Sequence, residues 1–201
     1  MNLSQLPNAI TIIRILLVVP VVYCLGQGLY AWALYLFLAA GVSDALDGLL
    51  ARQFHWRSRF GAIADPLADK LLMVASFFAL SALGHLPWWL FLLVLFRDFV
   101  IVVGGLVYHR IIGPFKMQPS IFSKFNTFCQ ILLVLLVFLH LAHQVPSQSI
   151  LNQLLWLVVI TTIGSGVHYG WFWGRKFASE YRVLKAQIRS NSQVRSDSND
   201  G

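Results

Sequence analysis

Long apolar runs separated by short polar connections account for most of this 201-residue chain. Each run is about 20 residues long, the length of helix that crosses roughly 30 Å of hydrocarbon. Helices suit that setting because they satisfy their backbone hydrogen bonds internally. The pattern therefore predicts an all-α integral membrane protein with six transmembrane helices, at about residues 9–27, 29–51, 61–83, 87–109, 120–142 and 150–173.

The connections between these runs differ in charge. Arg and Lys gather in 52–60, in 110–124 and from Arg175 onward, whereas the alternate connections contain neither residue. Cytoplasmic connections of membrane proteins carry an excess of Lys and Arg. Both termini and the connection after Arg52 are therefore expected to face the cytoplasm.

Composition supports the membrane assignment and bounds the domain organisation. Charged residues make up 11% of the chain, against roughly 25% in soluble domains. Residues 1–177 are expected to form one membrane domain, and the polar residues 178–201 a disordered tail. The net charge of +7 lies in the connections and the tail, which favours anionic lipid headgroups over nucleic acid as a partner.

Half of the eight acidic residues lie within one short stretch, from Asp44 to Asp69. Asp44 and Asp47 are three apart at the end of the second predicted helix, and Asp65 and Asp69 are four apart at the start of the third. Residues at these spacings share one face of a helix. The short connection between the two helices predicts antiparallel neighbours, so we expect the four carboxylates to converge near the membrane surface.

Four ionised carboxylates in one place repel one another strongly, so a cation must compensate them. Arg52 and Lys70 are candidates, but hard divalent cations match an all-oxygen site best. Two such ions held about 4 Å apart recur in phosphate chemistry. The small residues Gly48, Ala51 and Gly61 leave room for a ligand. The cluster therefore predicts two divalent cations, Mg²⁺ or Mn²⁺, beside a phosphate-bearing ligand.

Three other interpretations of the acids compete with a metal site. Interfacial acids can pair with arginines of the connection, but two helical pairs with Gly and Arg at fixed offsets exceed that need. An ion or proton transporter also uses intramembrane Asp residues, yet these gather at one membrane face and no broken-helix pair occurs in matching halves. A prenyl-diphosphate enzyme would carry Asp-Asp-x-x-Asp motifs, which the spacing does not follow.

The order and spacing of these residues resemble the signature of the CDP-alcohol phosphatidyltransferase family. From Asp44 the chain reads Asp-x-x-Asp-Gly-x-x-Ala-Arg, then eight residues, Gly, three residues, Asp, three residues and Asp69. The segment "PNAITIIR" also resembles the family's Asn-x-x-Thr-x-x-Arg element. The resemblance covers about residues 5–177 and implies six transmembrane helices, often in a homodimer, with a polar active-site cavity open to the cytoplasm.

In that family an acceptor hydroxyl attacks the phosphorus on the lipid or alcohol side of a CDP-linked donor, and CMP leaves. Carried over residue by residue, the resemblance implies that Asp44, Asp47 and Asp65 are metal ligands. It implies that Asp69 is the general base and also lies close to a metal. It further implies that the CDP group is bound by Asn8, Thr11, Gly48, Ala51, Arg52 and Gly61.

Polar residues in other predicted helices bear on the acceptor. A stripe in the fifth helix either supplies interhelical hydrogen bonds or lines an acceptor cavity in which Lys124 receives a phosphate; its residues are Ser123, Lys124, Asn126, Thr127 and Gln130. Arg97 and Asp98 lie near the middle of the fourth helix, where charges are costly. They form either a structural pair or a substrate contact.

The stretch "PSIFSKFNTFCQ" resembles eukaryotic-type cardiolipin synthases, and "FRDFVIVVG" and "YGWFWGRK" do so as well. Phosphatidylglycerophosphate synthases more often carry Arg-Glu at Arg97-Asp98 and a second Lys at Asn126. The resemblance therefore favours CDP-diacylglycerol as donor and phosphatidylglycerol as acceptor, contacted by Lys124, Asn126 and Arg97, with glycerol 3-phosphate as the alternative acceptor. Because the chain lacks an Arg-rich transit segment, we expect a bacterial inner membrane.

Overall fold

The computed structural model describes residues 6–53, 61–112 and 121–167, which form six helices and no strand. The helices are α1 (Leu6–Gly26), α2 (Tyr30–Gln53), α3 (Gly61–Ala82), α4 (Trp88–Ile112), α5 (Ile121–His143) and a sixth helix, Gln148–Val167. The all-α prediction is confirmed, and the bounds of α1 to α5 agree with the predicted runs to within about three residues. The predicted tail, 178–201, lies outside the described residues.

Apolar side chains cover the outer surface of these helices, and polar groups gather inside. Leu16 and Phe99 are more than half exposed, whereas Arg14 and Asn126 are almost completely buried. This distribution suits contact with lipid, because a charged or amide group in hydrocarbon must find its partners inside the bundle. Among the described residues, α5 and the sixth helix are long and apolar enough to cross a membrane.

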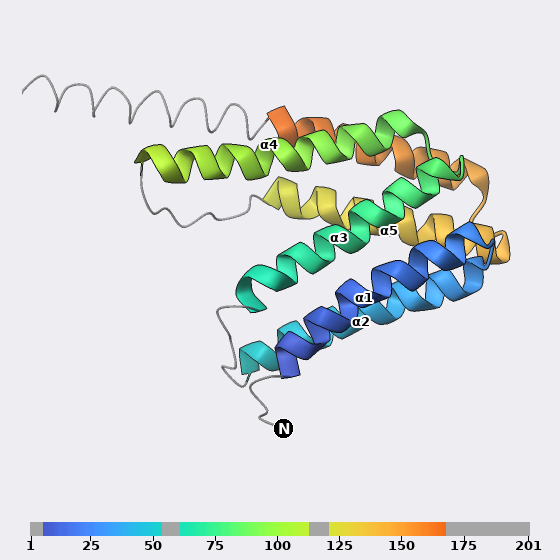
Figure 1. Cartoon of the computed structure of the whole chain (residues 1–201). Coiled ribbons are helices and arrows are strands. Elements are labelled where there is room, and N and C mark those ends of the chain that lie inside the picture. The colour runs from blue at the N-terminus through green and yellow to red at the C-terminus, as the bar shows by residue number, and fades with distance from the viewer. Residues whose placement is uncertain (1–5, 54–60, 113–120, 168–201) are drawn as a thin grey trace, which may run out of the picture.

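Successive helices run in opposite directions, so each end of the bundle contains three N-terminal and three C-terminal helix ends (Figure 1). The N-terminal ends of α1, α3 and α5 lie on the left of the view, with the C-terminal ends of α2, α4 and the sixth helix. We call this the open end of the bundle. Short turns join the helices at the opposite, closed end.

The helix α1 is central to the packing of the first half of the chain. α1 packs against both α2 and α3, α5 packs against α2 and α3, and α4 packs against α3. Across the described residues, α2 and α3 make no direct packing contact. They are antiparallel as predicted, and in the described part of the bundle α1 and a cavity lie between them. Close approach of the two ends that carry the four acids stays a prediction.

Glycines shape the turns at the closed end. Gly28 and Gly84 have positive φ angles of 71° and 79°, which glycine adopts without the clash that a Cβ atom would cause. The hydroxyl oxygen of Tyr30 lies 3.3 Å from Nε2 of His85, and burial lowers the pKa of His85. The imidazole is therefore neutral near pH 7, and its contact with Tyr30 joins the start of α2 to the turn between α3 and α4.

The hydrophobic core lies toward this closed end. Phe37 of α2 and Phe138 of α5 meet edge to face, with ring centroids 5.3 Å apart. Leu80, Leu90 and Leu133 add fully buried side chains from α3, α4 and α5. Edge-to-face pairs and dense packing hold helices together in lipid, where the hydrophobic effect between helices is weak. The closed end therefore anchors the helices whose other ends form the candidate site.

Candidate active site

The two acidic pairs lie on separate helices at the open end of the bundle. Asp44 and Asp47 fall within the last three turns of α2, and Asp65 and Asp69 within the first three turns of α3. The helical spacing predicted for each pair is confirmed. Figure 1 shows that these two helix ends lie at the same end of the bundle. The side chains of the four acids lie outside the described part of the chain, so their convergence stays a prediction.

The residues predicted to bind the CDP group lie in the same region of the backbone. Gly48, Ala51 and Arg52 belong to the last two turns of α2, and α3 begins at Gly61. Asn8 and Thr11, the other two, lie in the first two turns of α1, which packs against both of those helices. The fold therefore gathers three separate sequence motifs at one end, while the contacts of their side chains stay predictions.

The candidate metal ligands fit the cations that the sequence predicts. All four are carboxylates, the donors that Mg²⁺ and Mn²⁺ prefer over nitrogen and sulfur. They come from two helices whose ends lie at one end of the bundle. Among the side chains that the structure describes, no group of three or more His, Cys, Asp or Glu residues competes as a metal site.

A cavity of about 410 Å³ lies directly inward of these helix ends. Side chains from α1 to α5 line it, and most are apolar. Its polar lining residues are Arg14, Lys70, Asp98, Thr127 and Gln130. Two of these residues lie close along their helices to candidate site residues, since Arg14 follows Thr11 by about one turn and Lys70 comes directly after Asp69. An anionic headgroup with apolar chains matches such a lining.

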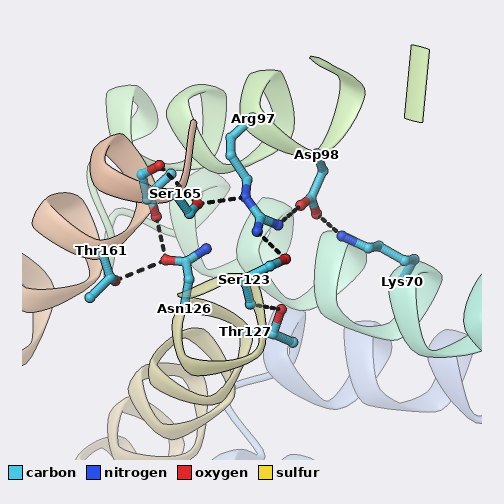
Figure 2. A network of polar contacts seen from close by, with 9 residues as sticks. Lys70, Arg97, Asp98, Ser123, Asn126, Thr127, Thr161 and Ser165 are labelled. Atoms are coloured by element: carbon cyan, nitrogen blue, oxygen red, sulfur yellow. Dashed lines mark hydrogen bonds and ion pairs between the residues drawn. The ribbon is translucent and has the colours of Figure 1, made fainter. Parts of the chain in front are cut away.

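Arg97 and Asp98 form the centre of a polar network that joins four helices (Figure 2). The Arg97 guanidinium donates to Asp98 Oδ1 at 2.7 Å, to Ser123 Oγ at 2.5 Å and to Ser165 Oγ at 3.0 Å. The Lys70 ammonium contacts the other carboxylate oxygen of Asp98. The pair is therefore part of an interhelical network, and the Asp98 side of that network reaches the cavity.

The polar residues of the α5 stripe have two different surroundings, an interhelical contact and the cavity. Asn126 is fully buried, and its Oδ1 accepts hydrogen bonds from Thr161 at 2.8 Å and Thr162 at 2.9 Å. Thr127 and Gln130 line the cavity instead. Lys124 is exposed and is not among the lining residues that the structure describes. Acceptor binding by Lys124, Asn126 and Arg97 stays a prediction, and the geometry assigns Asn126 to interhelical bonding.

The sequence alone did not place Lys70 and Arg14 on the cavity. The sequence predicts Lys70 only as a counter-ion for the acids, and Arg14 only as the last residue of the N-terminal element. One feature of the sequence does indicate this position. Both residues are cations inside or beside apolar runs, where a charge usually faces a cavity or a partner. The partner of Lys70 could not be inferred, because Asp98 lies on another helix.

Replacing Asn126 with alanine is expected to destabilise the bundle by about 1–3 kcal/mol, from two interhelical hydrogen bonds and lost packing. Thermal unfolding in detergent measures the change, and Phe125→Ala, an exposed position on the same helix, is the control with little effect. If Asn126 instead binds the acceptor, Asn126→Ala will raise the acceptor KM and leave Tm unchanged.

Comparison with known proteins finds the same family that the Asp44 to Asp69 motif resembles. A family model described as CDP-alcohol phosphatidyltransferase matches residues 4–164. A Mycobacterium tuberculosis protein named "Probable phosphatidylglycerophosphate synthase" is 31% identical over 176 residues, 84% of this chain and 81% of its own length. An Aquifex aeolicus CDP-diacylglycerol–glycerol-3-phosphate 3-phosphatidyltransferase is 32% identical over 164 residues, 79% of this chain and 89% of its own length. A Schizosaccharomyces pombe cardiolipin synthase (CMP-forming) / mitochondrial hydrolase fusion protein is 31% identical over 183 residues, 84% of this chain and 31% of its own length.

Proposed function

Because the chain belongs to the CDP-alcohol phosphatidyltransferase family, we propose that it makes cardiolipin from CDP-diacylglycerol and phosphatidylglycerol and releases CMP. The observation that carries the choice of acceptor is the stretch from Pro119 to Gln130, which resembles eukaryotic-type cardiolipin synthases. The named fusion protein of Schizosaccharomyces pombe supports the same acceptor. The mostly apolar cavity suits substrates that carry acyl chains.

In the proposed reaction, Asp69 takes the proton of the attacking glycerol hydroxyl. The hydroxyl oxygen forms a bond to the phosphorus next to diacylglycerol, and the bond from that phosphorus to the bridging oxygen breaks. CMP leaves with the bridging oxygen. Asp44, Asp47, Asp65 and Asp69 would hold two divalent cations, which supply neutralising charge for the diphosphate and the departing CMP.

The remaining motif residues are proposed to hold the donor in place. Arg52 is suited to the diphosphate, because a guanidinium donates paired hydrogen bonds to phosphate oxygens. Gly48, Ala51 and Gly61 leave room for the nucleotide against the backbone of α2 and α3. Asn8 and Thr11 supply polar groups from α1, completing a site built from three helices.

Glycerol 3-phosphate is the second candidate acceptor. The protein of Aquifex aeolicus that has this substrate in its name matches this chain over 89% of its own length and 79% of this chain. Glycerol 3-phosphate also has a hydroxyl that can attack and a phosphate, so the same chemistry applies.

An ion or proton transporter is the distant alternative from another class of protein. A transporter has no reason to cleave a CDP-lipid, so release of CMP separates the two classes.

The proposed setting is a bacterial inner membrane, crossed six times by a chain that forms a homodimer. Connections rich in Arg and Lys alternate with connections that contain neither, which supports a cytoplasmic location for both termini and for the open end of the bundle. The donor would then reach the site from the cytoplasmic leaflet.

The acceptor can be identified by offering phosphatidylglycerol and glycerol 3-phosphate separately to the purified protein with CDP-diacylglycerol and Mg²⁺ or Mn²⁺. We expect CMP release and cardiolipin with phosphatidylglycerol alone. Phosphatidylglycerophosphate formed from glycerol 3-phosphate would replace the first proposal with the second. If neither acceptor supports release of CMP, both acceptor assignments are wrong.

A further inference from the structure

Lys70 differs from the other cation of the polar network in how firmly it is held. Arg97 has 4% of its side chain exposed and donates hydrogen bonds to three different residues. The Lys70 side chain is 45% exposed, and within the described side chains its ammonium contacts Asp98 alone. Lys70 also lines the cavity, which Arg97 does not. Lys70 is therefore the cation of the two that can turn toward a ligand.

Asp98 would remain compensated if Lys70 turned away. Its Oδ1 accepts a charge-assisted hydrogen bond of 2.7 Å from Arg97, whatever Lys70 contacts. Removing the partner of a buried charge is costly mainly when the charge is left alone. Because Asp98 has two cationic partners and needs one, exchange of the Lys70 contact does not strand a buried carboxylate.

The cavity also favours an anion. Among its described lining residues, Lys70 and Arg14 are cations and Asp98 is an acid, and Arg97 pairs with Asp98 from outside that lining. The surrounding walls are apolar, and a low-dielectric wall strengthens the attraction between unlike charges. Gln130 adds a donor, because its Nε2 is buried without a hydrogen-bond partner among the described residues.

We propose that Lys70 exchanges its contact with Asp98 for the phosphate of the acceptor, and that Gln130 contributes to this subsite. The inference rests on the proposed function and names a residue that the sequence had not assigned to the acceptor. Both candidate acceptors carry the required group, as a phosphodiester in phosphatidylglycerol and as a phosphomonoester in glycerol 3-phosphate. Lys70 directly follows the proposed base Asp69 in α3, so a phosphate held by Lys70 keeps the attacking glycerol close to that turn.

The first test measures steady-state kinetics of Lys70→Met in the full-length protein, with each acceptor in turn. The KM for the acceptor is expected to rise about 10- to 100-fold, the loss of one hydrogen bond to a charged group. The KM for CDP-diacylglycerol should stay within about twofold of the wild type, since the substitution removes no group assigned to the donor. Lys70→Arg should recover most of the acceptor affinity, because it keeps the charge.

Two further variants give matched comparisons. Lys185→Met removes a charge beyond residue 164, where the family match ends, and should behave as the wild type. Lys124→Met tests the rival residue of α5. A raised acceptor KM in Lys124→Met together with an unchanged one in Lys70→Met would overturn the proposal and restore Lys124 as the acceptor ligand.

A purely structural ion pair predicts a different result. Lys70→Met would then lower Tm and leave the acceptor KM at the wild-type value, which overturns the proposal. A readout without turnover is calorimetric binding of inorganic phosphate, which Lys70→Met should weaken at least about tenfold. Absence of CMP release from the wild type would refute the proposed function, whereas the phosphate binding data would still decide on the subsite.

Discussion

Replacing Asp69 with asparagine is expected to lower the rate of CMP release about 1000-fold or more, as loss of a general base does. An amide cannot take the proton of the attacking hydroxyl, and it is a poorer ligand than a carboxylate for a hard cation. The change keeps the size of the side chain, so α3 should form as before. CMP release from CDP-diacylglycerol at saturating acceptor measures the effect.

Two controls separate a chemical effect of Asp69→Asn from a structural one. The Tm of the variant should stay close to the wild-type value, because the amide has nearly the same shape as the carboxylate that it replaces. Glu180→Gln, the same change beyond the family match at residue 164, should keep the full rate. Retention of more than about a tenth of the wild-type rate by Asp69→Asn would contradict the assignment of Asp69 as general base.

The helices could be predicted from the sequence because each coincides with an apolar run of about 20 residues, a length that is a local property of the chain. The arrangement of α1, α2 and α3 could not be predicted in the same way. In a membrane protein both the lipid-facing and the core-facing sides of a helix are apolar, so hydropathy does not show which faces meet. The position of α1 and of the cavity between α2 and α3 follows from tertiary packing.

In the candidate site, local features could likewise be predicted from the sequence, whereas contacts between helices could not. The acids could be found because their spacing within each helix is a local property, and the structure places both pairs in helices at the open end. The partners of Asn126 and Lys70 could not be found, because Thr161, Thr162 and Asp98 lie on other helices. Local spacing was enough to predict the acidic motif, whereas the interhelical bonds required the fold.

Removing divalent cations with EDTA is expected to lower CMP release to below about 1% of the full rate, and Mg²⁺ or Mn²⁺ should restore it. Without a cation, the four carboxylates at the open end would repel both one another and the anionic diphosphate of the donor. CMP release at a series of free metal concentrations measures the requirement. An undiminished rate in EDTA would contradict a metal-dependent site.

The same titration can assign the metal to the acids of α2 and α3. Asp44→Asn removes one proposed ligand and should raise the metal concentration for half-maximal rate by at least about 10-fold, the lower bound seen when even outer-shell support is lost. Asp98→Asn is the matched control, because its carboxylate is bound to Arg97 and Lys70 and lies on α4. It should lower Tm and leave the metal requirement unchanged. Equal shifts in the two variants would mean that the metal requirement depends on the overall charge of this region rather than on ligands from the Asp44 to Asp69 motif.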